Sequence, residues 1–592
     1  MTHRAMDCIE TMQGSHLRRD TAVLLATVSG IATTNPGMIE WFARETMVTV
    51  ITTKSFQVEP NCGNREPVIT EPQPGSFGNA VGLRNPGLAV ARSELTELRS
   101  RWSELRPAIT ESGIDTVVTA AVRDGTQPAL LLNVSIAGRD EAEFRVLARE
   151  LAPLADLLEL NLSCPHAGGG YGAAIGCDPV LVARCTRAAV DAAGATPVFA
   201  KLTPNTSHIG AIAQRAVAAG ATGIVAINTV GPEQYRERET GTVILNNPAL
   251  QGRGGQSGRW VRERALECVR DIRRAIGPQV PIIGMGGVER PADARAMRAA
   301  GADVVGVGSA LALVHQQDWP GMLRAMAQPG ADSRVRYRPK AGMDYRRLAV
   351  SHRRELGGGL FELGLRGSLT FEPGQSCFLR LPEIGEKPFS PALADPATFL
   401  IRRRGPFTNA LGTLEPNGYV FVRGPYGEGP GVIDAEAAGT AARMTPGTAY
   451  ILAAGSGAAL APRLALRLTA AGLPVRIWLG LRDDVTGIPL ATDIERHGPL
   501  SVVHDRGTLG RVIHEALASP DVRAGGVGSL WVIGPAAFMR ASAAEFSGSG
   551  VPFRAIRCSL EEEMLCGVGL CGMCHRDGRL TCQYGTFTGE RT

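Results

Sequence analysis

The first half of the sequence alternates short apolar runs with longer stretches of mixed polarity. Ala- and Arg-rich stretches such as residues 179–194 separate most of the apolar runs and predict helices. Eight strands alternating with helices predict an α/β fold, a (β/α)8 TIM barrel rather than an open sheet. The predicted strands lie in residues 23–30, 49–56, 129–138, 157–165, 197–204, 223–230, 280–288 and 304–311.

Polar side chains gather where these apolar runs end. In a TIM barrel the functional residues lie at the carboxyl ends of the strands. The residues at those positions are Ser29, Lys54, Asn133, Asn161, Cys164, Lys201, Asn228 and Thr229. This placement predicts a site at one end of a barrel domain that spans residues 1–325.

The pattern changes after residue 325. Residues 326–342 are rich in Pro, Gly and charge and predict a linker. Short alternating segments in 343–432 predict a small antiparallel β-barrel. A strand–glycine–helix pattern in 433–550 predicts a small α/β nucleotide domain, and 551–592 form a glycine- and cysteine-rich segment. Ser559 and Glu562 have the spacing of a capping box, which predicts a short helix there.

Composition narrows the class of protein. With 592 residues, 44% hydrophobic and 20% charged, the chain is an ordinary globular protein of several domains. A net charge of +5 is too small to indicate nucleic-acid binding. The sequence has neither a bilayer-spanning apolar run nor the apolar core of a signal peptide, which predicts no membrane association and a cytoplasmic location. Twelve cysteines in so large a chain favour a reducing compartment.

Four cysteines near the C-terminus have a diagnostic spacing. Cys566, Cys571, Cys574 and Cys582 follow the pattern C-x4-C-x2-C-x7-C. This is the plant-type spacing for a [2Fe–2S] cluster. A structural zinc site is the alternative, but it more often pairs two short C-x2-C knuckles.

Three glycine loops flank the last two predicted barrel strands. They are Gly254–Gly258, Gly284–Val288 and Gly306–Ala310. Glycine-rich loops at this end of a TIM barrel bind phosphate, so a phosphate-bearing cofactor such as FMN fits. Lys54 and Lys201 each end an apolar strand and need an anionic partner, for which a reduced flavin is suitable. The alternative is that each lysine extends to solvent at the rim.

Cys164 is open to two interpretations. A free cysteine is often a small core residue. Here it follows Asn161 and Ser163 and precedes a glycine loop that could close as a lid. A thiol beside a flavin could remove a proton from a substrate carbon while a hydride leaves the neighbouring carbon.

The motifs in residues 20–315 resemble those of the FMN-containing class 1 dihydroorotate dehydrogenases. In order they are "NAVGLRNPG", "NLSCP", "KLTPN", "NT", "GGQSG", "PIIGMGGV" and "VGSA". Residues 343–592 resemble the electron-transfer subunit of the class 1B enzymes, a ferredoxin-reductase-like module that carries FAD, a [2Fe–2S] cluster and an NAD site. The resemblance implies that both subunits are fused in this chain.

The resemblance also assigns roles by position. Cys164 is the implied catalytic base. The implied substrate-binding residues are Lys54, Asn79, Gly82, Leu83, Asn161, His166, Asn228 and Thr229. The implied FMN-binding residues are Ser29, Gly30, Lys54, Asn133, Lys201, Gly258, Gly286, Gly287, Gly308 and Ser309. The implied FAD-binding residues are Lys387, Pro388, Phe389, Ser390, Gly405 and Thr408, and the four C-terminal cysteines are the implied iron ligands.

The sequence departs from the family at several positions. His166 replaces the Asn that contacts orotate, which brings "LELNLSCPH" closer to the pyrimidine-reducing domain of dihydropyrimidine dehydrogenase. Lys387 replaces an Arg and so lacks the bidentate fork for phosphate. The loop "GSGAALAP" is longer than the family's nucleotide loop, and Ile533 stands where many relatives have Cys, so the sequence departs from the family pattern at the implied NAD site.

The expected activity is the oxidation of (S)-dihydroorotate to orotate in pyrimidine biosynthesis. Electrons would pass from FMN through the cluster and FAD to NAD+ or another acceptor. One alternative is a dihydropyrimidine dehydrogenase or reductase acting on a uracil- or thymine-type ring. Another is a non-catalytic flavoprotein that relays electrons or senses a ligand. The expected assembly is a homo-oligomer.

Overall fold

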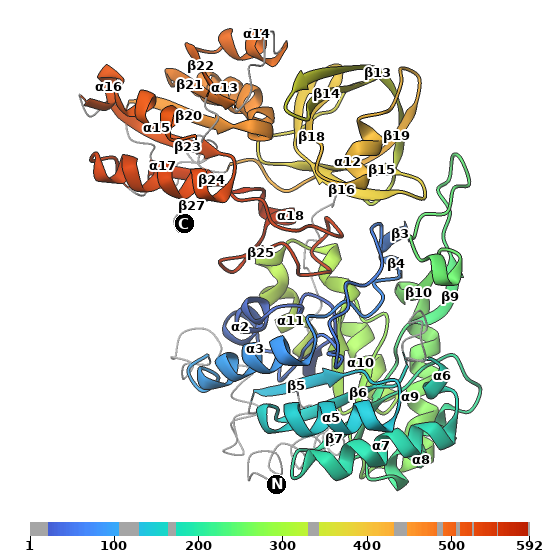
Figure 1. Ribbon diagram of the computed structural model, residues 1–592. Coiled ribbons are helices and arrows are strands. Elements are labelled where there is room, and N and C mark those ends of the chain that lie inside the picture. Colours follow the sequence, from blue (N-terminus) through green and yellow to red (C-terminus); the bar gives the residue numbers. More distant parts are fainter. Residues whose placement is uncertain are drawn as a thin grey trace. The chain divides into compact units, whose positions relative to one another are not determined.

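The computed structural model describes residues 22–105, 130–163, 173–328, 342–430, 447–481, 489–504, 509–523, 526–552 and 555–589. The chain divides into two compact units (Figure 1). The first comprises Met1–Lys340 and Val568–Gly578, and the second comprises Ala341–Gly567 and Arg579–Thr592. The change from the first unit to the second lies within the predicted linker. Among the described residues, no helix is long and apolar enough to cross a membrane.

The first unit contains the predicted barrel. Strand β1 pairs in parallel with both β12 and β2, which closes the sheet in the order β1-β12-β11-β8-β7-β6-β5-β2. Buried aliphatic residues and Phe199 fill its interior. The TIM-barrel prediction is therefore confirmed. The strands are β1 (Leu24–Thr27), β2 (Val50–Thr52), β5 (Leu131–Ile136), β6 (Leu157–Asn161), β7 (Val198–Lys201), β8 (Gly223–Ala226), β11 (Ile282–Met285) and β12 (Val304–Val307).

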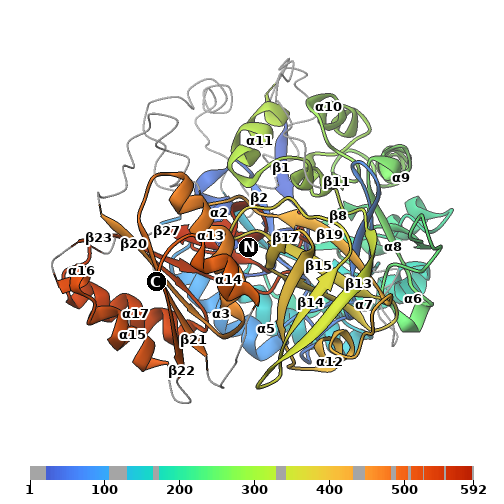
Figure 2. The ribbon, with the colours of Figure 1, turned by 90° about the horizontal axis from the view of Figure 1, so that it is seen from above.

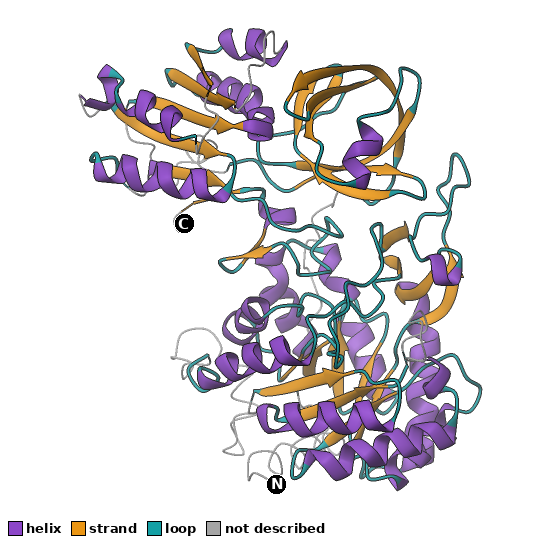
Figure 3. Ribbon diagram, viewed as in Figure 1, coloured by secondary structure: helices purple, strands orange, loops and turns teal. Residues whose placement is uncertain are grey.

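Helices surround this barrel (Figure 3). Several begin at a side chain that caps the first turn: Asp140 accepts from the Glu143 backbone N–H, and Asp178 accepts from those of Val180 and Leu181. Their apolar faces pack inward, as Phe144, Leu147 and Leu151 of α5 show. The main helices are α2 (Pro36–Glu45), α3 (Leu88–Ser100), α5 (Glu141–Leu151), α7 (Pro179–Ala193), α8 (Ile209–Ala218), α9 (Arg262–Ile276), α10 (Pro291–Ala299) and α11 (Trp319–Ala327).

A small antiparallel sheet that the sequence did not reveal is inserted into the barrel's loops. Its order is β3-β4-β10-β9, formed by β3 (Ile69–Gln73), β4 (Ser76–Asn79), β10 (Arg253–Gly258) and β9 (Val230–Gln234). Its register places Asn79 opposite Gly255 and Ser76 opposite Gly258. The sheet thus joins two segments separated by about 180 residues.

Part of the cysteine-rich segment packs with the barrel. The backbone N–H of Ala32 donates to the Leu570 carbonyl at 2.7 Å. Thr34 Oγ1 donates to the Cys571 carbonyl at 2.8 Å, and Asn35 Nδ2 donates to that of Gly572 at 2.9 Å. Residues 568–578 are thereby attached to the loop between β1 and α2.

The second unit begins with a seven-stranded antiparallel sheet where the sequence predicts an antiparallel β-barrel. Its order is β16-β15-β19-β13-β14-β18-β17. The sheet curls, with α12 (Pro406–Leu411) at one end (Figure 3). The strands are β13 (Arg346–Gly357), β14 (Leu360–Leu365), β15 (Ser376–Leu381), β16 (Gly385–Phe389), β17 (Pro391–Ala394), β18 (Ala397–Arg402) and β19 (Tyr419–Tyr426).

An α/β layer follows, in the order β22-β21-β20-β23-β24-β27. Helices cover both faces (Figure 2), with α13 (Ala461–Ala470) and α14 (Pro489–Glu495) on one side and α15 (Gly510–Leu517) and α17 (Ala536–Gly548) on the other. The strands are β20 (Thr448–Ala454), β21 (Val475–Leu481), β22 (Leu500–His504), β23 (Val527–Ile533), β24 (Ile556–Ser559) and β27 (Phe587–Gly589).

The predicted helix at Ser559 is wrong. Ser559 ends β24, and its hydroxyl donates to Thr586 Oγ1 at 2.8 Å. Residues 560–563 are not helical. Pairing of β24 with β27 satisfies this backbone and overrides the local capping signal.

A buried ion pair connects the curled sheet to the first of the four C-terminal cysteines. Arg423 and Glu386 are both fully buried, and Arg423 Nε donates to Glu386 Oε2 at 2.9 Å. Arg423 Nη1 also donates to the Cys566 carbonyl at 2.8 Å, and Tyr345 Oη donates to Glu386 at 2.5 Å. Removing one partner of such a pair leaves an uncompensated buried charge.

We expect Arg423→Met to destabilise the second unit by about 3–5 kcal/mol, because Glu386 loses its counter-charge. Hydrogen exchange of peptides from 346–426, followed by mass spectrometry, measures this loss. The control is Arg353→Met, which removes the half-exposed pair with Glu355 and should cost less than about 1 kcal/mol. Wild-type exchange in Arg423→Met would contradict the stabilising role of the pair.

Candidate functional site

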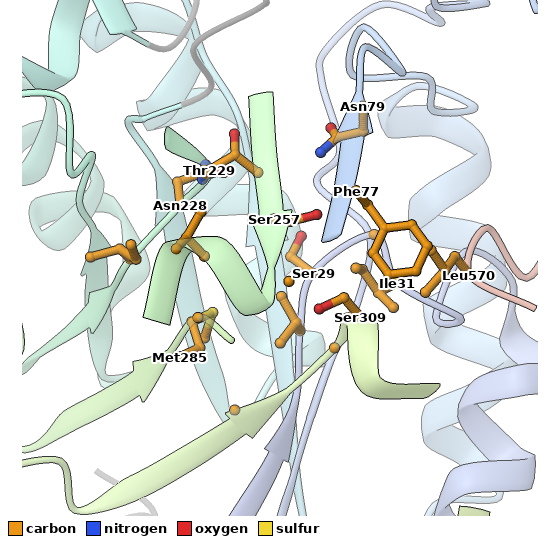
Figure 4. Close-up of a pocket in the computed structure, with 18 of the residues that line it drawn as sticks. Ser29, Ile31, Phe77, Asn79, Asn228, Thr229, Ser257, Met285, Ser309 and Leu570 are labelled. Atoms are coloured by element: carbon orange, nitrogen blue, oxygen red, sulfur yellow. Dashed lines mark hydrogen bonds between the residues drawn. The ribbon is translucent and has the colours of Figure 1, made fainter. Parts of the chain in front are cut away.

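A pocket opens at the carboxyl ends of the barrel strands (Figure 4). Most of the residues that the sequence assigned to substrate or FMN contribute to its wall. They are Ser29, Gly30, Lys54, Asn79, Leu83, Asn161, Lys201, Asn228, Thr229, Gly258, Gly286, Gly287, Gly308 and Ser309. Gly82 precedes Leu83 in the same loop, and Asn133 is fully buried on β5. Cys164 and His166 lie outside the described residues.

Two of the lining glycines are required by close backbone packing. A Cβ on Gly258 would lie 2.1 Å from the Gly75 carbonyl oxygen, and one on Gly287 would lie 2.6 Å from Arg262 Cβ. Both also have positive φ, at 92° and 71°. These loops come close to the pocket only because the residues lack side chains.

An ion pair that the sequence did not reveal joins the same two loops. Arg259, which follows Gly258, donates through Nε to Glu289 Oε2 at 3.0 Å, and Glu289 follows the pocket residue Val288. Burial raises the pKa of the Glu289 carboxyl, while the hydrogen bond from Arg259 opposes that rise. The pair fixes the separation of the two glycine loops.

Asparagine side chains form a connected polar wall. Asn228 Nδ2 donates to Asn161 Oδ1 at 3.2 Å and to Ser163 Oγ at 2.9 Å. The Thr229 backbone N–H donates to Asn228 Oδ1 at 2.8 Å. Asn79, on β4, is held by a bond from its Nδ2 to the Gly255 carbonyl at 3.2 Å. The pocket therefore presents amides whose orientations are already determined.

The lysine at the end of β7 has a buried partner. Lys201 Nζ lies 3.3 Å from Glu159 Oε1, and both side chains are almost completely buried. Lys54 is also buried and lines the pocket. Both lysines therefore lie in the pocket wall, and the alternative interpretation, that they extend into solvent, is not what the structure shows.

Apolar residues form most of the remaining wall, to which Ser55, Gln256 and Ser257 add polar groups. The sequence revealed none of these as site residues except Leu83. Phe77, Ile31 and Leu570 lie together on one side of the pocket (Figure 4). Leu570 belongs to the cysteine-rich segment attached to the β1–α2 loop. Only the tertiary structure brings this residue to the pocket.

The pocket fits the FMN that the resemblance implies. Asn133 Oδ1 and Thr229 Oγ1 are buried without a hydrogen-bond partner among the described residues, so the amide oxygen can accept a hydrogen bond from a bound group and the hydroxyl can accept or donate one. The Gly287 and Gly308 loops lie where TIM barrels bind phosphate. The chemistry and the shape of this pocket suit a phosphate-bearing aromatic cofactor.

The predicted FAD residues lie together in the second unit. Phe389, at the end of β16, stacks on Phe407 of α12, with ring centroids 6.3 Å apart and planes 18° apart. The backbone N–H groups of Arg404 and Gly405 donate to Thr408 Oγ1 at 2.8 and 3.1 Å. Lys387 is exposed, and Pro388 and Ser390 are partly buried. The two sequence motifs thus adjoin in space.

The four cysteines predicted as iron ligands are all buried. Within the part of the chain that the structure describes, no three His, Cys, Asp or Glu side chains form a group that could hold a metal ion. The cluster assignment therefore remains a prediction from spacing and burial.

Comparison with known proteins gives the family. Residues 19–321 match the dihydroorotate dehydrogenase family. The catalytic subunit of dihydroorotate dehydrogenase B (NAD(+)) from Methanothermobacter thermautotrophicus is 36% identical over 261 residues, which cover 44% of this chain and 74% of that protein. Dihydroorotate dehydrogenase A (fumarate) from Lacticaseibacillus paracasei is 38% identical over 281 residues, which cover 46% and 84%.

A solved structure, ligand-free DHODH from Eimeria tenella, aligns with a TM-score of 0.40 and 20% identity over 55% of this chain and 92% of that chain. The family match spans just over half of the residues, and it contains the barrel and all the pocket residues except Leu570. The chain therefore belongs to the dihydroorotate dehydrogenase family, whose members are FMN-binding oxidoreductases that act on CH–CH groups.

Proposed function

We propose that this protein oxidises dihydroorotate to orotate and passes the electrons to NAD+. The observation that supports this most directly is the pocket. The predicted substrate-binding and flavin-binding residues line it together, and Leu570 of the cysteine-rich segment also contributes to its wall. The names of the relatives, dihydroorotate dehydrogenase B (NAD(+)) and A (fumarate), agree with the proposed substrate.

The residues divide the work by chemistry. Asn79, Asn161, Asn228 and Thr229 would hold the ring of the substrate through its amide groups, and Lys54 and Lys201 would place positive charge beside the cofactor. FMN would be held by the Gly258, Gly287 and Gly308 loops and supplies hydride acceptance when bound. The apolar wall of Phe77, Ile31 and Leu570 would exclude water from the reacting atoms.

Cys164 is the proposed base. It is the residue after Ser163, which is fully buried and hydrogen-bonded to Asn161 and Asn228. The Cys164 thiol would take a proton from the substrate carbon next to the one that loses hydride. The site and the base would then lie on the same side of the barrel.

Electron exit is proposed through the C-terminal segment. The four cysteines would hold a [2Fe–2S] cluster, which carries single electrons. Residues 568–578 are bonded to the β1–α2 loop, and Leu570 is in the pocket wall, which supports a short path from the flavin. FAD would lie at the Phe389–Phe407 pair, and the ferredoxin-reductase-like module would bind NAD.

A uracil- or thymine-type ring is the second candidate substrate. The observation that favours it is His166, which stands where an Asn contacts orotate in the family that the sequence resembles. The two rings differ at the carboxylate, and His166 is the proposed residue that would distinguish them.

Purified protein should contain FMN, FAD and about two irons per chain, because a [2Fe–2S] cluster needs four thiolates and the chain provides four at the right spacing. Elemental analysis and cofactor extraction measure this content. Cys571→Ser should lose iron and retain FMN, whereas Cys62→Ser, at an exposed cysteine in the first unit, should lose neither. Zinc in place of iron would contradict the proposed electron route.

Cys164→Ser should slow reduction of the FMN by dihydroorotate roughly 10²- to 10⁴-fold, because a serine hydroxyl is a much weaker base. Stopped-flow absorbance at the flavin band measures the rate across pH. FMN content should not change, and NADH oxidation with an artificial acceptor should stay near wild type. A variant that is reduced at the wild-type rate would show that the thiol is not the base.

His166→Asn should keep or increase turnover of dihydroorotate if orotate is the natural product, because it restores the amide that the family uses there. If the natural substrate is a uracil-like ring, the same change should shift preference toward the carboxylated ring. Steady-state kcat/KM for dihydroorotate and dihydrouracil separates the two. An unchanged ratio would place His166 away from the substrate.

A further inference from the structure

A residue of the pocket wall has a backbone conformation that is unusual for its type. Leu83 lies in the loop between β4 and α3, lines the pocket and has a φ of 55°. This is the left-handed region, in which the Cβ of any residue except glycine lies too close to the following carbonyl oxygen. The preceding Gly82 has a φ of 77°, which glycine adopts without strain. Strain of the kind at Leu83 persists only where the surrounding structure imposes it.

Backbone hydrogen bonds hold the two ends of this loop. At one end, the Asn64 N–H donates to the Val81 carbonyl at 3.1 Å. At the other end, Asn61 and Asn85 exchange two backbone bonds, each 2.9 Å long. Neither contact involves the N–H or the carbonyl of Leu83, so the conformation of this residue depends on other bonds.

Two asparagine side chains hold the middle of the loop. Asn85 Nδ2 donates to the Leu83 carbonyl at 2.8 Å, and Asn61 Nδ2 donates to that of Gly82 at 3.1 Å. Among the described residues, neither carbonyl has another hydrogen-bond donor. Because glycine adopts a positive φ without support, only the bond from Asn85 acts on a strained residue. Asn85 is therefore the side chain on which this conformation depends.

The amide of Asn85 has a single orientation that satisfies its neighbours. Its Oδ1 accepts from the backbone N–H groups of Gln57 at 3.1 Å and Gly87 at 2.9 Å. Both groups can only donate, so the amide oxygen faces them and Nδ2 faces the Leu83 carbonyl. Nδ2 also donates to Gln57 Oε1 at 2.7 Å, and both side chains are buried. The bond to Leu83 thus follows from backbone donors that fix the amide.

We propose that Asn85 is a positioning residue, which holds Leu83 in the left-handed conformation and thereby fixes the part of the pocket wall that this leucine forms. Asn85 does not itself line the pocket. Without Nδ2, the Leu83 carbonyl would lose its donor, and the residue would relax to the negative φ that leucine ordinarily adopts. Its backbone and side chain would then leave their places in the wall. The substrate rests on the proposed function, whereas the effect of Asn85 on Leu83 does not.

Asn85→Asp removes the donor, because it keeps the shape and the accepting oxygen but places a second oxygen against the Leu83 carbonyl. Affinity of the FMN-loaded protein for orotate, read from the shift of the flavin absorbance, should fall about tenfold or more. FMN content should equal that of the wild type, because Leu83 is not among the residues assigned to FMN. Wild-type affinity in this variant would overturn the proposal.

The matched control is Asn247→Asp. Asn247 is also buried and also donates through Nδ2 to a loop carbonyl, that of Arg253 at 3.0 Å, but it does not line the pocket, and Arg253 does not have a positive φ. This variant should bind orotate as the wild type does, and a loss equal to that of Asn85→Asp would overturn the proposal. If Asn85→Asp does not yield folded protein, Asn85→Ser, which removes Nδ2 without adding a charge, replaces it in every measurement.

A pair of substitutions at position 83 separates the conformational effect from the charge that Asp adds. Leu83→Ala and Leu83→Gly both remove the side chain, but only alanine is strained at a positive φ. Asn85→Asp should therefore lower orotate affinity about tenfold more when combined with Leu83→Ala than when combined with Leu83→Gly. Equal losses in the two backgrounds would mean that Asn85 does not act through the strained backbone, and the proposal would fail.

The last test does not depend on the substrate. Crystal structures of the ligand-free proteins should show Leu83 with a positive φ in the wild type and with a negative φ in Asn85→Asp. A variant in which Leu83 keeps its positive φ would overturn the proposal. A wild-type protein that binds neither orotate nor dihydroorotate would contradict the proposed function, and the φ of Leu83 would still decide this inference.

Discussion

Closure of eight parallel strands into a barrel is the constraint on which the pocket depends. The pairing of β1 with both β12 and β2 makes the sheet continuous, so the carboxyl ends of all eight strands meet at one rim. Residues as far apart as Ser29 and Ser309 therefore share one pocket wall. The inserted sheet of β3, β4, β10 and β9 adds Phe77, Asn79 and Gly258 to that wall.

The interior of the barrel is not uniformly apolar, and this has a consequence for the pocket. Glu159, Lys201, Ser135 and Asn133 are buried together in adjacent strands, and a buried polar group is costly unless it has partners. Each partner then needs a partner of its own, until the network reaches a surface that a ligand can contact. The polar pocket wall formed by Asn161 and Asn228 is the end of that network. The side chains of the pocket wall are thus held in place partly because the buried polar groups inside the barrel need hydrogen-bond partners.

The second unit uses a buried charge differently. Arg423 and Glu386 connect β19 and β16, and Arg423 also donates to the carbonyl of Cys566. A guanidinium has five donors in a rigid plane, so one side chain can bind a carboxylate, the Tyr426 hydroxyl and a backbone carbonyl at once. Arg423 thereby bonds the backbone at Cys566, the first of the four C-terminal cysteines, to the curled sheet.

The sequence by itself determined the features that depend on local pattern. The eight barrel strands and the polar residues at the strand ends were predicted, because alternation of apolar runs with helices and their termination are encoded within a few neighbouring residues. Fourteen of the predicted residues line the pocket, because the carboxyl ends of barrel strands converge at one rim independently of the conformation of the loops.

Only the tertiary structure decided the rest. The small sheet escaped notice because its strands are short and glycine-rich and pair across about 180 residues. Leu570 is held at the pocket by a hydrogen bond from the Ala32 backbone N–H to its carbonyl, a contact that no local sequence pattern predicts. The contact of the buried Glu159 with Ser135 depends on the register of β5 and β6, and the failed helix at Ser559 shows the same effect, since β24 pairing outweighed a capping signal. Contacts between distant segments contribute free energy that local secondary-structure propensity does not include. The local pattern of a sequence therefore predicts where strands lie but not which segments pack beside them.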